Sequence, residues 1–421
     1  MDPREEKLKY LSESVRRNLF ECILPVWRDH SEDSVNGGFL GRINEDLSPD
    51  HSYSKALVLM TRELWTFSKA YKLTSEERYA ELADRCFEFI NSRFWDERYG
   101  GVYFDITSDG YPLELEKRTY AQAFLVYSFS EYYLARGRRE ALDRAVFLFG
   151  KLTDHVRTPD GAYIDTTGRD WVVDPLGAIW WMNPGGTPLL LNSQLHVFES
   201  MISLYQASGC EGVKDRLREL LSFLMTRAYD REHCCLKAGM DMAGNRLDDE
   251  ICYGHDAEFS YLLTGAADLL GGEELKAQAS ETALAIADHI VREGTDPVYG
   301  GVWFDYHYES GVLNRCKVWW NQAEALTALV NAYQLSGEER FLDAACGIWR
   351  YIDENLVDRK YGEWFAVGPY TYSGPADILH QQARAKRVGR EKASRVKCPY
   401  HSSRCCMEVM ARTEKLLEEI K

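Results

Sequence analysis

The stretch FWDERYGGVYFD, residues 94–105, decides the fold because copies of it recur along the chain. The stronger copies are DPVYGGVWFD at 296–305 and DRKYGEWFAV at 358–367. The weaker copies are NGGFLGRI at 36–43 and DGAYID at 160–165. In the clearest copies apolar and polar residues alternate beside a glycine, which is typical of a short strand next to a turn.

The glycines of these copies give the period of the repeat. Successive ones lie 63, 61, 139 and 62 residues apart, in the order Gly37, Gly100, Gly161, Gly300 and Gly362. The long interval is about twice the others, so it predicts one more, degenerate copy, for which we take LKAGMDMAGNRL at 236–247. Six units of roughly 62 residues indicate a repeat architecture.

Amphipathic segments with apolar residues at i, i+3, i+4 and i+7 separate the copies and predict helices. They include 55–71, 120–135, 194–206, 257–270 and 322–335. Each unit has room for two helices and one loop, so we expect an all-α fold of about twelve helices with short β-hairpin loops, closed into an (α/α)6 barrel. An open solenoid is the competing arrangement. No linker rich in Pro, Gly or Ser separates the units, and we predict a single catalytic domain over residues 1–421.

The composition excludes several classes of protein. Of the 421 residues, 45% are hydrophobic and 13% aromatic, which is incompatible with a disordered chain. The net charge of −16 leaves no chain-wide basic field for nucleic acid, and no apolar run approaches the roughly 18 residues of a membrane span. The charged N-terminus and the 11 cysteines, some adjacent as in Cys234-Cys235, predict reduced thiols in a cytoplasmic protein.

Two clusters at predicted helix starts carry candidate catalytic side chains. In YGHDAE at 253–258, His255 and Glu258 share a helix face, as an acid–base imidazole and its carboxylate partner would. In WWNQAE at 319–324, Trp320 and Glu324 also share a face, which suits stacking on a sugar ring beside a hydroxyl acceptor. The structural alternatives are a charged helix start and a tryptophan of the core.

Other candidates are polar residues at helix starts or a charge inside an apolar helix. His401 follows KCPY at a loop-to-helix junction, Asn192 and His196 open the helix at 194–206, and Arg62 interrupts the helix at 55–71. Ordinary capping or a structural histidine is the alternative for the first three, whereas a buried arginine needs a partner or an anionic ligand. The histidines lack a compact spacing such as H-E-x-x-H, and there is no P-loop or G-x-G-x-x-G, so we predict neither a metal site nor a nucleotide cofactor.

These motifs together resemble the N-acylglucosamine 2-epimerase superfamily, and most closely its cellobiose (mannobiose) 2-epimerase branch. The matching stretches span nearly the whole chain in the same order and spacing: TRELWTFSKAY (61–71), FWDERYGGVYFD (94–105), TYAQAFLVYSFSEYY (119–133), LNSQLHVFES (191–200), YGHDAE (253–258), WWNQAEA (319–325) and KCPYH (397–401). The resemblance implies an (α/α)6 barrel, no cofactor and a small-molecule sugar as substrate. We expect a monomer or homodimer.

The resemblance also implies roles for individual residues. His255 and His401 match two catalytic histidines that act on the two faces of the sugar C2, and His196 matches a third histidine of the site. The matching substrate-binding positions are Arg62, Tyr120, Asn192, Glu258, Trp320 and Glu324. One histidine would remove the C2 proton of the open-chain sugar, Arg62 would stabilise the resulting cis-enediolate, and the other histidine would return a proton from the opposite face. Proton return to C1 would give a ketose instead, so D-mannose 2-epimerisation and mannose/fructose isomerisation are the nearest alternatives.

The chain departs from this branch at several positions. Tyr261 and Val396 stand where the branch has tryptophan, Pro184 stands where it often has aspartate, and SQLH at 193–196 replaces THLH. These changes bear on the choice between mono- and disaccharide more than on the proton chemistry. We expect the stretch 169–191, which contains Trp171, Trp180 and Trp181, to shape the mouth of the cavity.

The segment 380–397 is basic, with seven Lys or Arg against one acid, and it runs into His401. One hypothesis is that it borders the cavity and favours an anionic sugar, and the alternative is a solvated surface loop. Two other function classes stay open. One is a glycoside hydrolase or polysaccharide lyase, with Glu258 and Glu324 as the facing carboxylates, and the other is a non-catalytic sugar-binding protein.

Overall fold

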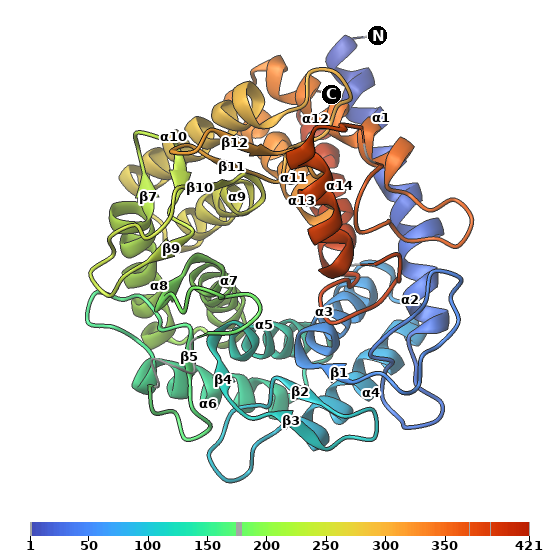
Figure 1. Cartoon of the computed structure of the whole chain (residues 1–421), viewed down its shortest axis with the longest axis vertical. Coiled ribbons are helices and arrows are strands. Elements are labelled where there is room, and N and C mark those ends of the chain that lie inside the picture. Colours follow the sequence, from blue (N-terminus) through green and yellow to red (C-terminus); the bar gives the residue numbers. More distant parts are fainter. Residues whose placement is uncertain (1, 174–178, 370, 388, 421) are drawn as a thin grey trace.

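A computed structural model describes residues 2–173, 179–369, 371–387 and 389–420, of which 385–387 by their backbone only. Its helices form two concentric rings (Figure 1). The inner ring consists of α3 (Leu57–Thr74), α5 (Thr119–Arg136), α7 (Leu191–Ser208), α9 (Tyr253–Leu270), α11 (Trp319–Ser336) and α14 (Tyr400–Ile420). The outer ring consists of α1 (Pro3–Asn18), α4 (Glu77–Arg93), α6 (Arg139–His155), α8 (Glu211–Phe223), α10 (Glu273–His289) and α12 (Glu339–Asn355). The predicted all-α (α/α)6 barrel is confirmed.

The two ends of the chain close the ring. Each inner helix from α3 to α11 packs on the outer helix that follows it, as in an ordinary helical hairpin. The last inner helix, α14, packs instead on α1, and it also contacts α11 and α3 on either side (Figure 1). The sixth pair is therefore assembled from the two termini rather than from neighbouring segments, and the arrangement is a closed barrel rather than an open solenoid.

Burial differs between the rings in the way that the sequence pattern predicts. In the inner helix α5 every residue from Thr119 to Tyr132 is buried, because this helix packs against two inner neighbours and one outer helix. The outer helix α6 buries one stripe: Ala141, Leu142, Ala145, Leu148, Phe149 and Leu152. This i, i+3, i+4 spacing is that of a helix with one face on the core and the other in solvent.

Apart from α3, the inner helices begin earlier than their apolar pattern predicts. The helix predicted at 257–270 starts at Tyr253, and the helix at the predicted loop-to-helix junction of His401 already starts at Tyr400. The first turns contain polar residues, which hide the start of a helix when only hydrophobic periodicity is followed. His255 and His401 consequently lie inside the first turn of their helices rather than in the preceding loops.

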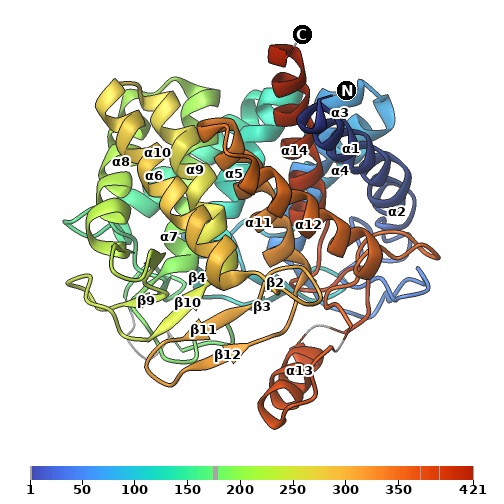
Figure 2. The ribbon, with the colours of Figure 1, turned by 90° about the horizontal axis from the view of Figure 1, so that it is seen from above.

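Besides the two rings, the structure contains short helical segments that extend ring helices, and one further helix, α13. α2 (Leu24–His30) continues α1 through the π-helical turn η1 (Leu19–Ile23), while η2 (Leu224–Ala228) and η3 (Ile290–Gly294) extend α8 and α10. α13 (Pro375–Arg387) projects from the barrel on the side of the strands (Figure 2). Among the helices of the described residues, none has both the length and the apolar character that crossing a membrane requires.

The strands are short and gather at one end of the barrel (Figure 2). Two antiparallel sheets have three strands each: β1 (Lys55–Ala56), β2 (Asp105–Ile106) and β3 (Pro112–Glu114), and β10 (Glu250–Cys252), β11 (Asp305–His307) and β12 (Val312–Asn314). The two-stranded pairs are β4 (Lys117–Arg118) with β5 (Thr166–Thr167), β6 (Leu189–Leu190) with β9 (Gly239–Met240), and β7 (Tyr229–Asp230) with β8 (Cys235–Leu236). Because β1, β4, β6 and β10 each lead directly into an inner helix, the strands surround the N-terminal ends of those helices.

The repeated glycine motif forms one kind of turn, and its degenerate copy is not where we predicted it. In the clear copies an aspartate accepts backbone N–H groups of the turn, as Asp96 does from Arg98, and the glycine four residues on has a positive φ of 72° at Gly100. The same geometry recurs at Asp230, with Cys234 in the glycine position at φ 50°. The prediction of 236–247 is therefore wrong, because a cysteine in the left-handed region hid the copy at 230–234 from a search for glycine.

A second repeat lies under these turns and was not predicted. The turn aspartate is paired with a buried lysine from the same end of the barrel in four copies: Asp33–Lys55, Asp96–Lys117, Asp296–Lys317 and Asp358–Lys392. Both side chains of each pair are almost fully buried. A buried charge of this kind is tolerated only with its partner, so each pair ties a turn to the segment beside it.

In several inner helices the side chain of the fourth residue forms hydrogen bonds with backbone groups of the neighbouring loop. Gln122 accepts the N–H of Val102 at 3.0 Å and donates to its carbonyl at 2.8 Å, and Gln194 and Gln322 make the equivalent contacts. In α9 this position is Asp256, which accepts the N–H of Leu236 at 2.7 Å. Burial raises the pKa of Asp256 to about 8. These clamps fix the loops around the first turns of the inner helices.

Candidate active site

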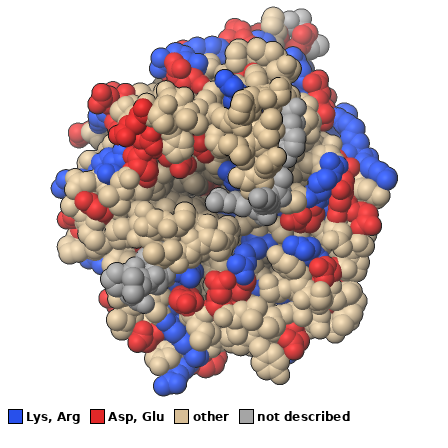
Figure 3. All heavy atoms as spheres, in the orientation of Figure 1, with Lys and Arg blue, Asp and Glu red and all other residues tan. Residues whose placement is uncertain are grey.

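A cavity of about 260 Å³ opens at the centre of the strand-bearing end, where all six inner helices of the described barrel converge. The space-filling view shows a hollow in the middle of this face (Figure 3). Eight of the nine residues predicted for the site line the cavity: Arg62, Tyr120, Asn192, His196, His255, Glu258, Trp320 and His401. The ninth, Glu324, lies behind His401 rather than on the cavity wall. Residues from six separate helices are thus brought to one place.

Two histidines share one tryptophan in this cavity. The ring of Trp320 on α11 lies 4.9 Å from the ring of His255 on α9 and 5.9 Å from that of His401 on α14. Gly254 makes this packing possible, because a Cβ there would lie 2.4 Å from the Trp320 ring. Trp320 therefore contacts both predicted catalytic histidines and forms part of the wall beside them.

Glu324 orients His401. Its Oε1 lies 2.6 Å from Nδ1 of His401, and its Oε2 accepts the hydroxyl of Tyr261 at 2.5 Å. A carboxylate accepts, so Nδ1–H is the donor and Nε2 is the nitrogen left to take or give a proton. Tyr261 is one of the departures from the branch pattern, and here it holds the carboxylate that positions the histidine.

Arg404 is at the centre of a buried charge cluster that we did not predict. Its guanidinium pairs with Glu199, with Glu258 at 2.5 Å and with Glu324 at 2.8 Å. The hydroxyl of Tyr400 donates to Glu199 at 2.6 Å. Three carboxylates from α7, α9 and α11 therefore share one cation from α14. Each is less than 4% exposed, so removing that cation would leave uncompensated buried charge.

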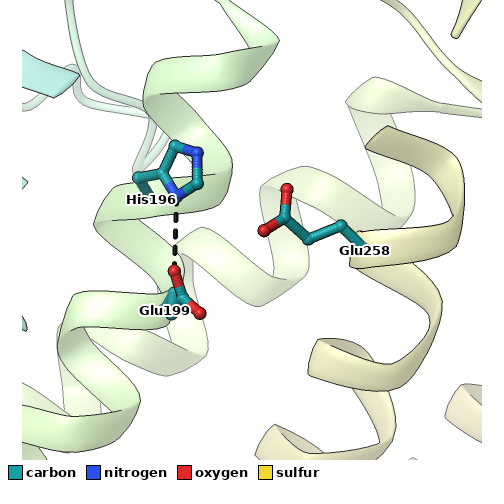
Figure 4. A group of neighbouring side chains, drawn as sticks. All are labelled: His196, Glu199 and Glu258. Atoms are coloured by element: carbon teal, nitrogen blue, oxygen red, sulfur yellow. Dashed lines mark hydrogen bonds and ion pairs between the residues drawn. The ribbon is translucent and has the colours of Figure 1, made fainter. Parts of the chain in front are cut away.

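His196 belongs to the edge of the same cluster. Its Nδ1 lies 3.3 Å from Oε2 of Glu199, one turn along α7, and Glu258 points toward the pair from α9 (Figure 4). Ligand atoms of His196, Glu199 and Glu258, and likewise of Glu258, Glu324 and His401, lie within 4.8 Å of one another, as a metal site would require. The Arg404 guanidinium already contacts all three of these glutamates, so the carboxylates that a metal ion would use have a protein cation as their partner.

Burial keeps the histidines of the site neutral. It lowers the pKa of His196 to about 3, and it lowers the pKa of His255 and, more strongly, that of His401 below the ordinary value for histidine. The Glu258 carboxylate opposes burial and raises the pKa of all three. Neutral imidazoles can act as bases near neutral pH, and Glu258 is the residue that stabilises their protonated forms.

Arg62 is buried without a carboxylate partner among the described residues. Its guanidinium donates to the Tyr120 hydroxyl at 3.0 Å and to the Cys398 sulfur at 3.5 Å, and it lies over the ring of Phe124 at 4.3 Å. The side chain is 4% exposed and lines the cavity. A buried cation held only by neutral groups is prepared to bind an oxyanion.

Other residues on the cavity wall were not singled out from the sequence. They include Glu250, Met182 and Trp319. Burial, with help from the carboxylates of Asp305 and Asp248, raises the pKa of Glu250 to about 7. Met182 and Trp319 carried no signal beyond being apolar, while Glu250 is a charged residue just before a predicted helix and could have been found by the rule that found His255.

From the sequence, the segment 169–191 is predicted to shape the mouth of the cavity and the basic segment 380–397 is hypothesised to border it, and both segments contribute residues to the cavity wall. Within 169–191, Trp181 lines its mouth, and residues 174–178 lie outside the described residues. Within 380–397, Arg384 lines the cavity, and residue 388 lies outside the described residues. Four of the seven basic side chains in this segment are paired with acidic residues: Arg390 at the surface, Arg395 partly buried, and Lys392 and Lys397 in the interior.

The comparisons with known proteins agree with this geometry. The model of the N-acylglucosamine 2-epimerase (GlcNAc 2-epimerase) family matches residues 38–369. The chain belongs to this family. The cellobiose 2-epimerase of Ruminococcus albus is 34% identical over 408 residues, covering 94% of this chain and 98% of the relative. The human N-acylglucosamine 2-epimerase is 23% identical, covering 87% of this chain and 84% of the relative.

Solved structures resemble the barrel as a whole. The cellobiose 2-epimerase of Bacillus thermoamylovorans superimposes with a TM-score of 0.86 at 28% identity, covering 96% of this chain and all of that one. A D-mannose isomerase has a TM-score of 0.79 at 18% identity, and the GH76 α-mannanase of Bacteroides thetaiotaomicron has 0.61 at 9%. The last two likenesses concern the fold alone.

Proposed function

We propose that this protein is a cofactor-independent sugar 2-epimerase that interconverts the gluco and manno configurations at C2 of a reducing-end sugar. The observation that carries the proposal is the placement of two neutral histidines, His255 and His401, beside Arg62 in one cavity. The relatives named cellobiose 2-epimerase support the reaction class. The proposal includes which sugar this chain prefers and which histidine takes or gives the proton at C2.

The chemistry follows from the acidity of the open-chain sugar. An aldehyde at C1 acidifies the proton on C2, and one neutral histidine removes it to leave a planar enediolate. The oxygens of the enediolate carry negative charge, for which the Arg62 guanidinium and the Tyr120 hydroxyl are the donors at hand. The second histidine returns a proton to the opposite face of C2; it does so in its protonated form, which Glu258 stabilises, and exchange with solvent restores both histidines after the turnover. Because Nδ1–H of His401 donates to Glu324, Nε2 is the atom that takes up a proton and, in the imidazolium, gives it back.

The glutamates favour this reaction over glycoside hydrolysis. A hydrolase needs two carboxyl groups flanking the bond, about 5–9.5 Å apart depending on the stereochemical course. Here Glu258 and Glu324 both pair with the Arg404 guanidinium, at 2.5 and 2.8 Å. Glu324 does not line the cavity. The pair is therefore arranged to tune and orient histidines rather than to face each other across a sugar.

Isomerisation of mannose to fructose is the second candidate, and the size of the cavity bears on the length of the sugar in either reaction. A volume of about 260 Å³ is below the roughly 300–1,000 Å³ of sites that hold drug-sized ligands. It suits one sugar ring better than two. The same enediolate gives a ketose when the proton returns to C1, so the two reactions share all the groups named above.

Proton NMR in D2O tests the proposal. The protein is incubated with glucose, mannose, cellobiose or mannobiose, and loss of the C2 proton is followed together with the products. We expect deuterium at C2 and the C2 epimer as product. His255→Asn and His401→Asn should each reduce exchange by roughly 100- to 10,000-fold, while a control at an outer histidine, His155→Asn, should not.

Each other outcome has a definite meaning. A ketose as the main product would assign the chain to the isomerase. Release of monosaccharide from cellobiose would support a hydrolase. Binding of sugar without C2 exchange would identify a non-catalytic sugar-binding protein and refute the proposal.

We also propose that residues 1–421 act as one catalytic domain in the cytoplasm. The ring is closed by α1 and α14, so neither end of the chain is separable from the barrel. The cysteines of the described residues are all free thiols, which suits a reducing compartment. Fractionation of cells and light scattering of the purified protein test the compartment and distinguish a monomer from a homodimer.

A further inference from the structure

The two carboxylate oxygens of Glu324 have different partners. Oε1 lies 2.6 Å from Nδ1 of His401 and 2.8 Å from a guanidinium nitrogen of Arg404, and both of these residues lie on α14. Oε2 accepts the hydroxyl of Tyr261, which lies on α9, at 2.5 Å. Because Glu324 itself lies on α11, three inner helices meet at one carboxylate. Of these four described side chains, His401 is the one that lines the cavity.

The hydroxyl of Tyr261 is a donor that stays protonated. Its side chain is 4% exposed, and burial raises its pKa well above the ordinary value for tyrosine. Burial also raises the pKa of Glu324, whereas the Arg404 cation and the hydrogen bond from Tyr261 lower it. Tyr261 and Arg404 therefore act together to keep Glu324 ionised, so that both of its oxygens accept.

The hydrogen bond from Tyr261 also determines how the carboxylate is turned. A guanidinium prefers to hold a carboxylate by two parallel hydrogen bonds, one to each oxygen. Here the closest contact of Arg404 with Glu324 is to Oε1, the oxygen that His401 also uses. Without a hydroxyl at Oε2, the carboxylate is free to turn both oxygens toward Arg404 and to leave Nδ1 of His401 without an acceptor. A neutral histidine without that acceptor can carry its proton on Nε2 instead, and Nε2 then has no lone pair with which to take a proton.

This contact differs from the pattern of the branch that the chain resembles. Tryptophan stands at the position of Tyr261 in that branch, and tryptophan has no hydroxyl group. The same helix, α9, also carries His255 in its first turn. Helix α9 thus places one histidine of the cavity directly and contacts the other, His401, through Tyr261 and Glu324.

We propose that Tyr261 is a positioning residue for proton transfer: by holding Oε2 of Glu324 it turns Oε1 toward Nδ1 of His401 and leaves Nε2 of that histidine free of a proton. The inference rests on the proposed function only for what Nε2 does to a sugar. The tautomer of His401 is a property of the free protein, and Tyr261 acts on it through Glu324 without touching substrate.

The kinetic test uses Tyr261→Phe, which removes one oxygen atom and keeps the ring. We expect kcat to fall about tenfold with less than a twofold change in KM, since a hydrogen bond to a charged group contributes about that much. In a Glu324→Gln background the same substitution should change kcat less than twofold, because a residue that acts through Glu324 has no further effect once Glu324 is altered. Tyr132→Phe is the matched control, because the buried Tyr132 donates its hydroxyl to Asp84 at 2.6 Å and does not line the cavity.

A spectroscopic measurement separates this inference from the proposed function. In protein labelled with nitrogen-15 histidine, the ring nitrogen shifts show which nitrogen carries the proton, whether or not any sugar is turned over. The signals missing from His401→Asn identify His401. We expect the Nδ1–H tautomer in the wild type and in Tyr132→Phe, and the Nε2–H tautomer or a mixture in Tyr261→Phe.

The two measurements give distinct outcomes. A tautomer change in Tyr261→Phe without epimerisation of any sugar would refute the proposed function and leave the positioning role of Tyr261 supported. The Nδ1–H tautomer in all three proteins would overturn the inference. So would a wild-type kcat in Tyr261→Phe, or losses that multiply in the double variant with Glu324→Gln, because Tyr261 would then not act through Glu324.

Discussion

Buried charge occurs in two regions of this barrel and is arranged differently in each. Under the repeated turns, one aspartate meets one lysine, as in Asp96–Lys117, and the two side chains come from the same unit of the repeat. At the centre, Arg404 faces three glutamates, Glu199, Glu258 and Glu324, that come from three different helices. In the first region every aspartate has a lysine of its own, and Asp96 has Arg169 as well, whereas the second region has more carboxylates than cations.

The difference corresponds to different tasks. A balanced pair has little effect beyond its own neighbourhood, so it can be repeated around the barrel to hold the turns in place. An excess of carboxylate acts on nearby titratable groups, and Glu258 raises the pKa of all three histidines of the cavity. The charge that makes the centre costly to fold is the same charge that prepares its histidines for proton transfer.

Removing the central cation should have the largest effect. Arg404→Met leaves three buried carboxylates without a cation, and we expect the free energy of unfolding to fall by about 3–5 kcal/mol, with loss of C2 exchange. Urea unfolding and the NMR exchange assay measure the two effects. Arg404→Lys keeps the charge but not the forked contacts, so it should lie between the two proteins. Wild-type stability in Arg404→Met would show that the cluster is not held by Arg404.

Removing the lysine of one aspartate–lysine pair under a repeated turn should lower stability without changing catalysis. In Lys317→Met the Asp296 carboxylate keeps backbone donors and the Tyr372 hydroxyl at 3.1 Å, so we expect a loss near the lower end of the range for broken buried pairs, about 3 kcal/mol. Exchange per folded molecule should stay at the wild-type rate. Lys276→Met, which removes an exposed pair with Asp268, serves as the control and should change stability by no more than about 0.5 kcal/mol.

Glu324 should act on catalysis more than on binding. Glu324→Gln keeps the shape but weakens the contact that fixes Nδ1–H of His401, and we expect kcat to fall by roughly 100-fold with a smaller change in KM. Steady-state kinetics on the fastest sugar separate the two constants. If KM rises while kcat is unchanged, Glu324 binds substrate, as the resemblance implied, and does not position His401.

The smallest effect is on the pH profile. Because burial lowers the pKa of His255 and His401, both stay neutral as the pH falls through 6.5, where an exposed histidine takes up a proton. The acidic limb of kcat/KM should therefore lie below pH 6.5. Glu258 raises both pKa values, so Glu258→Gln should move the limb to still lower pH. An exposed change, Glu76→Gln, is the control, and a wild-type limb above 6.5 would contradict the neutral state of the histidines.

The sequence predicts the barrel well because its signals are local. Glycine spacing and apolar periodicity are both read within one unit, and they gave the repeat and the inner helices to within a few residues. The copy at 230–234 was missed because Cys234 takes the place of glycine. That the chain is a single domain stays a prediction.

The site was predictable only in part because its contacts join distant segments. Residues at helix starts could be selected one by one, and the resemblance added Tyr120 and grouped them. Arg404 and Glu199 went unnoticed, although each is a charge within a buried helix, which is the signal that singled out Arg62. What no local pattern shows is their pairing, since α7 and α14 are far apart in the chain and meet only when the ring closes.

The closure of the ring by α1 and α14 has a consequence for the order of synthesis. Within this barrel α1 is synthesised before the other helices and its main partner α14 after them, so much of the apolar face of α1 stays uncovered until the rest of the barrel has been made. His401 and Arg404 arrive with that same helix. A chain cut short during translation would lack the closing helix and one of the two proposed proton carriers together, so incomplete copies should be both unstable and inert.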